Sequence, residues 1–307
     1  MSGPLIECVP NFSEGRDPAR FAGIRQAIAR VPGVLVLKSE MDADHNRSVI
    51  TFAGPPDAVV EGAFAGIRRA VEVIDLRQHT GVHPRIGAAD VVPLVPLEGV
   101  TLSECVRLAN DLGERVWREL GVPVFFYEAA ARDPQRERLE NVRRGGFENP
   151  SLQPDLGGPA LHRTAGATVI GARKFLIAFN VNLDTRDVGV AKAIARKIRA
   201  SSGGMPHVKA LGLMLESRGL AQVSMNLTDF EETPMLAVFD RVCAEAAALG
   251  VGIAGSEIIG LVPKKAMEMA AAYFLRVERF DSGSVLENRL DEARRLEHSL
   301  IPRRESP

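Results

Sequence analysis

The sequence predicts an α/β protein with α+β character, made of two similar subdomains, each a mixed β-sheet covered by helices. Three observations lead to this prediction. The chain has 307 residues, which is enough for two hydrophobic cores. Strand and helix patterns alternate along it, and the second half repeats the strand–helix–strand order of the first. The predicted subdomains are residues 1–175 and 176–307, with a seam near 160–180.

In the first half, short apolar runs indicate strands, and apolar residues three and four apart indicate helices. Phe21, Ile24 and Ile28 share one face of such a helix, which Pro32-Gly33 ends. The predicted strands are Leu5–Val9, Val34–Leu37, Ser48–Phe52, Val91–Leu97 and Pro123–Tyr127. The predicted helices are Pro18–Val31, Pro56–Val71 and Leu102–Leu120.

Residues 128–165 have no sustained period. Pro134–Arg144 is predicted to be a polar helix, because Asp133 is a good N-cap and Pro134 suits the first helical position. Gly145–Gly158 is predicted to be a loop. A loop this long in a compact protein usually links domains or binds a ligand.

The second half returns to alternating strands and helices. Its predicted strands are Phe175–Val181, Val208–Leu215, Ala221–Leu227 and Val251–Ala254. Its predicted helices are Val188–Ala200, Pro234–Leu249, Pro263–Leu275 and Ser284–Leu300.

Composition excludes several classes of partner. The chain is 46% hydrophobic and 25% charged, with a net charge of −1, so neither nucleic acid nor an anionic membrane is expected to bind. Cys8, Cys105 and Cys243 form no close pair, which favours buried, reduced thiols. The N-terminus lacks the pattern of a signal peptide, and no apolar run approaches the roughly 18 residues of a membrane span. A cytoplasmic location is therefore expected.

The segment Gly81–Asp90 is predicted to be a rigid loop that presents His83. Gly81 and Pro84 exclude a core helix, and an imidazole suits proton transfer at neutral pH. A structural role for His83 is the alternative. His79 and His83 are four residues apart, but the zinc pattern needs Glu after the first His and a continuous helix. No metal is expected.

Glycines mark a second candidate segment. Gly166–Arg173 has the glycine spacing of a phosphate loop but lacks Lys-Ser/Thr after the second glycine, so nucleotide binding is not expected. The stretch Leu156–Gly166 lets the backbone approach a ligand closely. A flexible loop without a ligand is the alternative.

Two polar clusters follow predicted strands. Asp42, Asp44, His45, Asn46 and Arg47 lie between two strands, where a solvated turn is the alternative to a binding site. Residues 11–16 (Asn-Phe-Ser-Glu-Gly-Arg) follow the first strand, where α/β proteins place residues that contact ligands.

Several motifs together resemble one known family. They are Glu7–Gly15, Asn46–Ser48, His83–Ala88, Gly166–Asn180, Leu220–Leu227 and Gly260–Pro263. In this order they closely resemble the glutamate formimidoyltransferase (formiminotransferase) family, including the transferase portion of formimidoyltransferase–cyclodeaminase. The likeness covers nearly the whole chain, and the helical cyclodeaminase portion is not part of it.

The resemblance implies a folate-dependent step of histidine degradation. The formimidoyl group of N-formimidoyl-L-glutamate passes to N5 of tetrahydrofolate, which is a co-substrate and can carry a polyglutamate tail. A homodimer and a ligand tunnel between the subdomains are implied as well. The catalytic residue would be His83. Folate would contact Gly157, Gly158, Pro159, Ala160, Leu161, His162, Arg163, Thr164, Ala165 and Gly166, although 160–165 departs from a more aromatic animal segment.

The roles of further residues are hypotheses. Both substrates carry carboxylates, which arginine forks suit, and Arg47, Arg85 and Arg173 are the candidates. Asp42, Asp44, His45 and Asp90 are candidate partners of His83. The full set of expected substrate-orienting residues is Asn11, Asp44, His45, Arg47, Arg85, Asp90 and Arg173. Two alternatives remain open: formyl transfer between glutamate and 5-formyltetrahydrofolate, and a folate-binding protein without catalysis.

Overall fold

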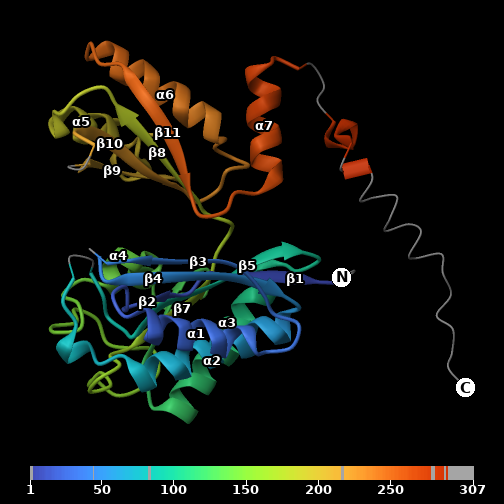
Figure 1. Cartoon of the computed structure of the whole chain (residues 1–307), viewed down its shortest axis with the longest axis vertical. Coiled ribbons are helices and arrows are strands. Elements are labelled where there is room, and N and C mark those ends of the chain that lie inside the picture. The colour runs from blue at the N-terminus through green and yellow to red at the C-terminus, as the bar shows by residue number, and fades with distance from the viewer. Residues whose placement is uncertain are drawn as a thin grey trace, which may run out of the picture. The chain divides into compact units, whose positions relative to one another are not determined.

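The computed structural model describes residues 3–43, 45–81, 84–215, 218–277, 281–286 and 288–289. The chain forms two compact units, which meet in sequence between Lys174 and Phe175. Unit 1 precedes this boundary and unit 2 follows it (Figure 1), and each has its own sheet and hydrophobic core. The predicted architecture of two helix-covered sheets is confirmed. The predicted helix Ser284–Leu300 lies mostly outside the described residues.

Unit 1 contains a seven-stranded sheet in which one strand is interrupted. Its strands are β1 (Leu5–Cys8), β2 (Asn11–Phe12), β3 (Leu35–Asp42), β4 (Arg47–Gly54), β5 (Ala89–Glu98), β6 (Val124–Glu128) and β7 (Thr168–Ala172). β1 and β2 both pair with β4 and β5, and Pro10 separates them, so they act as one broken strand. β3 extends the sheet beyond β4, and β7 and β6 extend it beyond β5. The pairings of β7 are parallel and the others are antiparallel.

Three helices cover one face of this sheet, as Figure 1 shows: α1 (Pro18–Ala29), α2 (Pro56–Val73) and α3 (Leu102–Leu120). Phe12, Ile50 and Phe52 point into the core beneath them. The prediction for α3 is confirmed at both ends. Thr101 and Glu104 form a capping box before it, and Gly121 ends it with a φ of 63°.

The other face of unit 1 is partly covered by irregular chain. Leu139, Leu152 and Leu161 pack there against a small core that includes Phe125 and Val169. The short helical elements of unit 1 are η1 (Leu76–Gln78), η2 (Pro134–Arg136) and α4 (Leu139–Val142).

The single predicted helix Pro134–Arg144 is wrong. Asp133 caps the backbone N–H of Gln135, as expected, but the helical turn that follows is only three residues long. Arg138 is extended, with a φ of −98° and a ψ of 119°, and a new turn begins after it. The break lets Val142 reach the small core, where it is fully buried.

Unit 2 has a smaller sheet of four strands. Its elements in chain order are β8 (Ile177–Leu183), α5 (Val188–Ile198), η3 (Ala200–Ser202), β9 (Val208–Leu215), β10 (Leu220–Leu227), α6 (Met235–Ala248), β11 (Ile253–Ile259), α7 (Lys264–Phe274) and η4 (Ser282–Ser284). The strand order is β11-β8-β10-β9. Every pairing in it is antiparallel, so the prediction of a mixed sheet holds for unit 1 and is wrong for unit 2.

The two units share a βαββαβ repeat. In unit 2 the repeat is β8-α5-β9-β10-α6-β11, and in unit 1 it is the broken strand β1/β2 followed by α1, β3, β4, α2 and β5. In both, the first and third strands are central, and the fourth and second lie outside them. This is the split-βαβ topology of ferredoxin-like folds. It explains the antiparallel sheet of unit 2, because each crossover skips one strand position.

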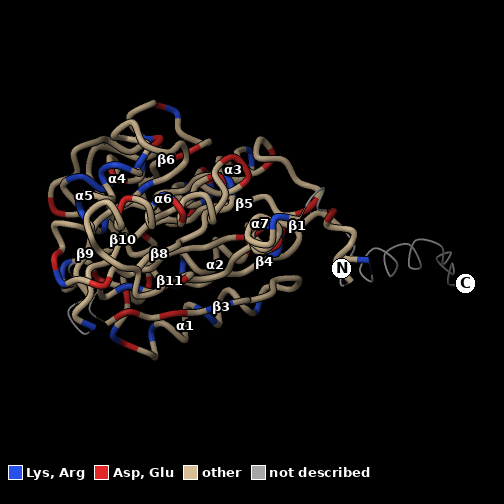
Figure 2. Tube along the Cα trace, turned by 90° about the horizontal axis from the view of Figure 1, so that it is seen from above, with Lys and Arg blue, Asp and Glu red and all other residues tan. Residues whose placement is uncertain are grey.

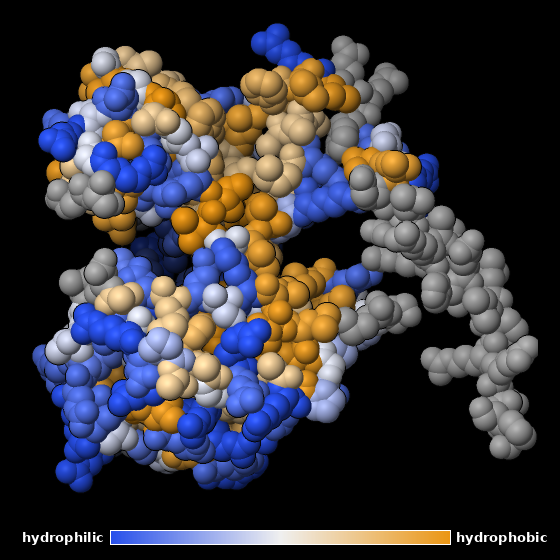
Figure 3. All heavy atoms as spheres, viewed as in Figure 1, coloured by the Kyte–Doolittle hydropathy of each residue, from blue (hydrophilic) through white to orange (hydrophobic). Residues whose placement is uncertain are grey.

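The surface of the described residues is mixed in character. The charged residues of α1 are Arg20 and Arg25, and those of β3 are Lys38, Glu40 and Asp42 (Figure 2). None of the described helices is long and apolar enough to cross a membrane. Hydrophobic side chains lie exposed at the end of α7, where Tyr273, Phe274 and Leu275 are 60%, 77% and 68% exposed (Figure 3). Cys8 and Cys105 are buried and Cys243 is half-buried, and all three are free thiols.

β7 is a buried strand that the sequence analysis did not predict, and its Gly171 is required by a close contact. A Cβ at Gly171 would lie 2.4 Å from the backbone oxygen of Tyr127 in the neighbouring strand. We therefore expect Gly171→Ala to destabilise unit 1 by about 1–3 kcal/mol in urea unfolding. Gly158→Ala is the matched control, because a Cβ there meets nothing within 4 Å. Equal stability of the two variants would contradict the described packing of β7.

Candidate active site

Polar side chains from separate segments of unit 1 surround one small cavity. β2 ends where β4 and β5 begin, and β4 and β5 flank it, so the adjoining loops meet at one end of the sheet. The cavity is lined by Ser13, His45, Asn46, Arg47, His79, Arg85 and Asp90. Three of the polar segments that the sequence analysis treated separately are therefore brought together.

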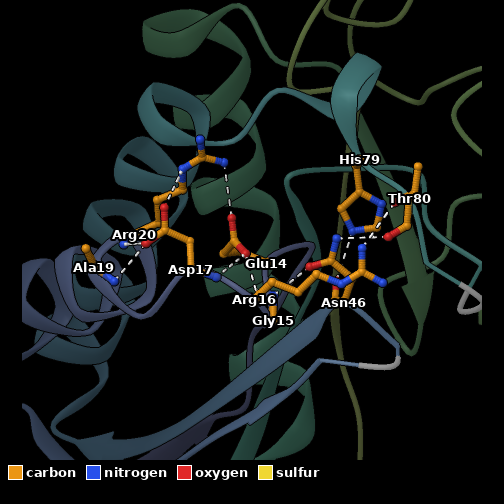
Figure 4. Close-up of polar contacts among 9 residues, drawn as sticks. All are labelled: Glu14, Gly15, Arg16, Asp17, Ala19, Arg20, Asn46, His79 and Thr80. Carbon is orange, nitrogen blue, oxygen red and sulfur yellow. Dashed lines mark hydrogen bonds and ion pairs between the residues drawn. The ribbon is translucent and has the colours of Figure 1, made fainter.

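The loop after β2 is held by a buried carboxylate (Figure 4). Glu14 is only 5% exposed, and its Oε1 accepts hydrogen bonds of 2.9 Å from the backbone N–H groups of Arg16 and Asp17. The Arg16 side chain then donates to the Thr80 hydroxyl at 3.2 Å. Ser13 donates from its hydroxyl to the carbonyl of Gly87 at 2.7 Å. This loop is thereby fixed to the segment that leads into β5.

The turn between β3 and β4 supplies an amide that joins three loops. Asn46 has a φ of 48°, a left-handed conformation that asparagine tolerates. Its Oδ1 accepts from the N–H of Gly15 at 2.9 Å, and its Nδ2 donates to the carbonyl of Thr80 at 3.0 Å. In the same turn, Nδ1 of His45 lies 2.8 Å from Oδ2 of Asp42. The predicted residue Asp44 lies outside the described residues.

A hydrogen bond holds the imidazole of His79 in place at this cavity. Its Nε2 lies 2.9 Å from the carbonyl of Asn46, while its Nδ1 is buried without a hydrogen-bond partner among the described residues. Burial lowers the pKa of His79, and the positive charge of Arg85 lowers it further, against the opposing effect of the hydrogen bond that the Asn46 carbonyl accepts from the ring. A neutral imidazole with one unused nitrogen results at pH 7.

The predicted catalytic residue, His83, lies outside the described residues, but its neighbours on both sides are at the cavity. Gly81 packs so closely that a Cβ would lie 2.6 Å from the carbonyl oxygen of His45. Arg85 lines the cavity itself. The described flanks of His83 therefore include one residue that packs on the turn between β3 and β4, Gly81, and one that lines the cavity, Arg85.

A buried carboxylate between two guanidinium groups lies at the cavity floor. Asp90 is 2% exposed, and its Oδ2 lies 2.6 Å from Nη2 of Arg143 and 3.9 Å from Nη1 of Arg47. Its Oδ1 accepts from the N–H of Ile86 at 2.8 Å. Burial alone would raise the pKa of Asp90, but Arg143, Arg47 and this hydrogen bond outweigh it, so the pKa is lowered.

The same cluster of buried charges lowers the pKa of Arg47. Burial and the charge of Arg143 lower the pKa of Arg47 to about 10, against the attraction of Asp90. Arg47 also donates from Nε and Nη2 to the Oδ1 of Asn11, at 2.9 and 2.6 Å. At neutral pH this guanidinium remains charged and is held in one orientation.

Of the two arginines that line the cavity, Arg85 has the ion-pair partner that a ligand could replace more easily. Its Nη2 donates to the carbonyl of His79 at 3.0 Å and to Oε1 of Glu148 at 2.7 Å. The Glu148 side chain is 61% exposed, whereas that of Arg85 is 14% exposed. An ion pair with so exposed a partner is weak, and another carboxylate can replace it.

The predicted folate segment, 157–166, is anchored at its C-terminal end to η1 and to the residue before β5. Gly166 exchanges backbone hydrogen bonds of 2.9 Å with His162, and the N–H groups of Ala88 and Leu76 donate to Ala165 and Thr164. The ring nitrogen Nδ1 of His162 accepts from the N–H of Ala165 at 3.1 Å. At the other end, residues 158–160 are exposed.

Arg173, another predicted orienting residue, lies apart from the cavity. It follows β7 and donates to the carbonyl of Leu94 from its backbone N–H, and its charge acts on Glu7 and Tyr127. Glu7 is 4% exposed, and burial raises its pKa to about 7 although Arg173 lowers it. Sequence reasoning missed this titratable carboxyl, because in a strand it looks like an ordinary surface residue.

The structure thus brings together four of the predicted orienting residues, His45, Arg47, Arg85 and Asp90, with Asn11 bonded to one of them. Sequence reasoning missed Arg143, which no local pattern distinguishes from its charged neighbours. Among the described residues, three potential metal ligands lie within 4.8 Å of one another in unit 2: His207, Asp229 and Glu232. None of them was predicted as a site residue.

The fold and this cavity define a two-unit α/β protein that gathers imidazole, guanidinium and carboxylate groups at one end of a sheet. Two family models match the chain: the formiminotransferase domain, N-terminal subdomain, over residues 5–173, and the formiminotransferase domain over residues 178–290. The chain belongs to the formiminotransferase family, which confirms the resemblance found in the sequence.

Individual relatives agree with this assignment. The glutamate formimidoyltransferase of Thermoplasma acidophilum is 48% identical over 302 residues, which cover 95% of this chain and 99% of the relative. That of Streptococcus pyogenes is 45% identical, with 93% and 98% covered. The formimidoyltransferase-cyclodeaminase of Gallus gallus is 45% identical over 90% of this chain, which spans 53% of that longer protein.

The buried cluster at the cavity floor generates a pH-dependent prediction. Asp90→Asn removes the charge between Arg47 and Arg143 and should cost about 3–5 kcal/mol of unfolding free energy at pH 7. Because the folded-state pKa is lowered, the contribution of the carboxylate is present above its unfolded pKa, near 3.8. It is lost as pH falls through the lower folded-state value. The stability gap between wild type and variant should therefore narrow below about pH 4 in urea titrations.

Asp75→Asn is the control, because Asp75 pairs with Arg77 at the exposed surface. It should change stability little at any pH. If Asp90→Asn lowered the free energy of unfolding by no more than the control does, the buried ion cluster would be contradicted.

Proposed function

We propose that this protein transfers the formimidoyl group from N-formimidoyl-L-glutamate to N5 of tetrahydrofolate, giving 5-formimidoyltetrahydrofolate and glutamate. The observation that carries the proposal is the 48% identity to a glutamate formimidoyltransferase along 99% of that relative's length. The charged cavity of unit 1 supports it, since both substrates carry carboxylates.

The chemistry needs one group that takes a proton and returns it. N5 of tetrahydrofolate attacks the amidine carbon, and its proton passes to an imidazole as the tetrahedral intermediate forms. The same imidazole then protonates the glutamate nitrogen as its bond to carbon breaks. His83 is the proposed proton carrier, because the described residues on both sides of it reach the cavity. The neutral His79 and the paired His45 would support the loop around it.

Binding is assigned to the charged residues at the cavity and to the glycine-rich segment. Arg85 and Arg47 would hold the carboxylates of formimidoylglutamate, with Asn11 and Asp90 fixing Arg47 in place. Residues 157–166 would contact the folate, and Gly157 and Gly166 have the positive φ values, 97° and 70°, that let a backbone fold back closely. Arg173 would act on a more distant part of a substrate.

We further propose a ligand tunnel between the subdomains 1–175 and 176–307, a cytoplasmic location and a homodimer. Three free thiols are typical of a reducing compartment. The exposed apolar side chains at the end of α7 are of the kind that subunit interfaces cover.

The catalytic assignment is tested by His83→Ala. With formimidoylglutamate and tetrahydrofolate as substrates, kcat should fall about 10²–10⁴-fold while the thermal transition is kept. His207→Gln in unit 2 is the control and should retain full activity. An undiminished rate for His83→Ala would remove His83 from the mechanism. Faster turnover of N-formyl-L-glutamate by the wild type would instead make the protein a formyltransferase, and tight folate binding without turnover would make it a binding protein.

The binding assignment is tested by Arg85→Gln. Because the substrate carboxylate would replace the exposed Glu148 as the partner of Arg85, the KM for formimidoylglutamate should rise about tenfold or more. The KM for tetrahydrofolate should change little. Arg77→Gln, which removes a surface guanidinium, is the matched control. A rise confined to the KM for tetrahydrofolate would assign Arg85 to the folate instead.

A further inference from the structure

The turn between β3 and β4 carries an imidazole that takes no part in the proposed proton transfer. His45 lines the cavity of unit 1 together with His79, Arg47 and Arg85. Its side chain is 50% exposed, so the ring is in contact with solvent as well as with the cavity. Histidine is the side chain that gains and loses a proton between pH 5 and 8. A ring in this place can carry protons between solvent and a ligand in the cavity.

One carboxylate fixes both the backbone and the ring of His45. Asp42, the last residue of β3, accepts from the backbone N–H of His45 through Oδ1 at 2.9 Å. Its Oδ2 lies 2.8 Å from Nδ1 of the ring. Because an ionised carboxylate only accepts hydrogen bonds, Nδ1 carries a hydrogen and donates it. Nε2 is therefore the ring nitrogen that can release and regain a proton while the bond to Asp42 is kept.

The turn is also held against the neighbouring loops, on both sides of His45. Before it, the carbonyl of Ala43 accepts from Nε of Arg16 at 2.9 Å. After it, the side chain of Asn46 bonds to the loop that follows β2 and to the carbonyl of Thr80. A catalytic group that is held in place in this way costs little entropy when the reaction occurs.

The charged groups around the ring determine when it is protonated. Asp42 attracts a positively charged ring, and Asp90 brings a second negative charge to the cavity. The guanidinium groups of Arg47 and Arg85 line the same cavity and oppose a positive ring. These two arginines are the groups proposed to hold the substrate carboxylates. Bound carboxylates offset their charge, so the ring of His45 takes up a proton more readily when substrate is present.

The proposed reaction consumes one proton that its two substrates do not supply. The glutamate nitrogen bears one hydrogen in the amidinium group of formimidoylglutamate and three in the ammonium group of free glutamate. N5 of tetrahydrofolate supplies one of the two added hydrogens, which His83 carries across. The other comes from solvent, and the proposed role of His83 does not deliver it.

This additional proton is needed when the carbon–nitrogen bond breaks. The electron pair of that bond goes to the glutamate nitrogen, and the terminal nitrogen of the formimidoyl group forms the new C=N double bond. The departing group is then a neutral amine, which can attack the formimidoyl carbon again. An ammonium group cannot, because its nitrogen has no free electron pair. Protonation of the amine therefore completes the transfer.

The cavity places the glutamate nitrogen near His45. The nitrogen and the α-carboxylate of glutamate are attached to the same carbon atom, so they bind side by side. Arg47, one of the proposed carboxylate ligands, is two residues from His45 in the chain and lines the same cavity. An α-carboxylate held at this arginine therefore brings the nitrogen to the part of the cavity that His45 borders.

We propose that His45 is a second catalytic acid, which protonates the departing glutamate nitrogen from Nε2 and regains the proton from solvent. Asp42 is its positioning residue. This inference rests on the proposed function, which names the substrates. The exposed side of the ring lets water return the proton to Nε2, so His45 ends each cycle in its starting state.

The first test compares two variants with formimidoylglutamate and tetrahydrofolate as substrates. His45→Ala removes the ring, whereas His45→Asn keeps an N–H group near the place of Nδ1 and has no counterpart of Nε2. In both, kcat should fall about tenfold to a hundredfold, at or below the lower end of the range for general acids, because water can also protonate the amine. The KM for formimidoylglutamate should change little, and the thermal transition should be kept.

His207→Ala is the matched control for these variants. Nε2 of His207 lies 2.8 Å from Oε2 of Glu232, and its side chain is 36% exposed, so unit 2 contains a similar histidine–carboxylate pair away from this cavity. This variant should keep the kcat of the wild type.

The second test is rescue by an acid in the buffer. At constant pH, kcat of His45→Ala should rise in proportion to the concentration of imidazolium, because a free acid can replace the missing one. The wild type and His207→Ala should not respond. Tetramethylammonium chloride at the same ionic strength has no proton to give and should restore nothing.

The positioning role of Asp42 is tested by the pH profile of kcat. Asp42→Asn keeps an acceptor for the backbone N–H of His45 and removes the charge that attracts the protonated ring. The decline of kcat on the alkaline side should therefore begin at a lower pH than in the wild type. An unchanged profile would remove Asp42 from the proposal.

The outcomes separate this proposal from the proposed function. Wild-type kcat in folded His45→Asn overturns the role of His45, and so does a loss of kcat that imidazolium does not restore. A raised KM for formimidoylglutamate with unchanged kcat makes His45 a ligand of the substrate and also overturns it. In these three cases the wild type is still a transferase. A wild type that does not turn over the two substrates overturns the proposed function and this inference with it.

Discussion

The burial of one carboxylate, that of Asp90, governs how the cavity of unit 1 is built. Its two oxygens bind groups from three parts of the chain: the backbone before β5, Arg143 of the irregular segment and Arg47 at the start of β4. An ionised carboxylate that is 2% exposed is tolerated only because these partners surround it. The backbone at Ile86 and the side chains of Arg143 and Arg47 are thus held together by one buried charge.

Local physical signals predicted most of the helices and strands. α3 has a polar cap, a regular apolar stripe and a terminal glycine, and its predicted bounds are those of the structure. β7 has none of these signals. Its Gly171 suggested a loop, because the need for a glycine comes from contact with Tyr127, which is 44 residues away in the chain. The antiparallel sheet of unit 2 was missed for a similar reason. A strand–helix–strand pattern does not indicate whether the helix connects adjacent strands or strands that have another strand between them.

The candidate site was predictable where its residues cluster along the chain. Arg47 and Arg85 were candidates because arginine forks suit carboxylate substrates, and Asp90 was a candidate partner of His83. The structure places all three at one cavity. Arg143 was not found, since a charged residue in an irregular segment gains its role only through a buried partner 53 residues away. Gln222 was in a quoted motif and Asn182 was not, and their contact depends on the register of β8 and β10, which no periodicity encodes.

The two repeats share one topology but bury different polar groups on their sheets. In unit 1 a single buried carboxylate faces both Arg47 and Arg143, and the partner of Arg85 is an exposed Glu148, so the local field favours an anion. In unit 2 the buried groups are neutral amides around the carboxylate of Glu257, so the local field favours N–H donors and disfavours an anion.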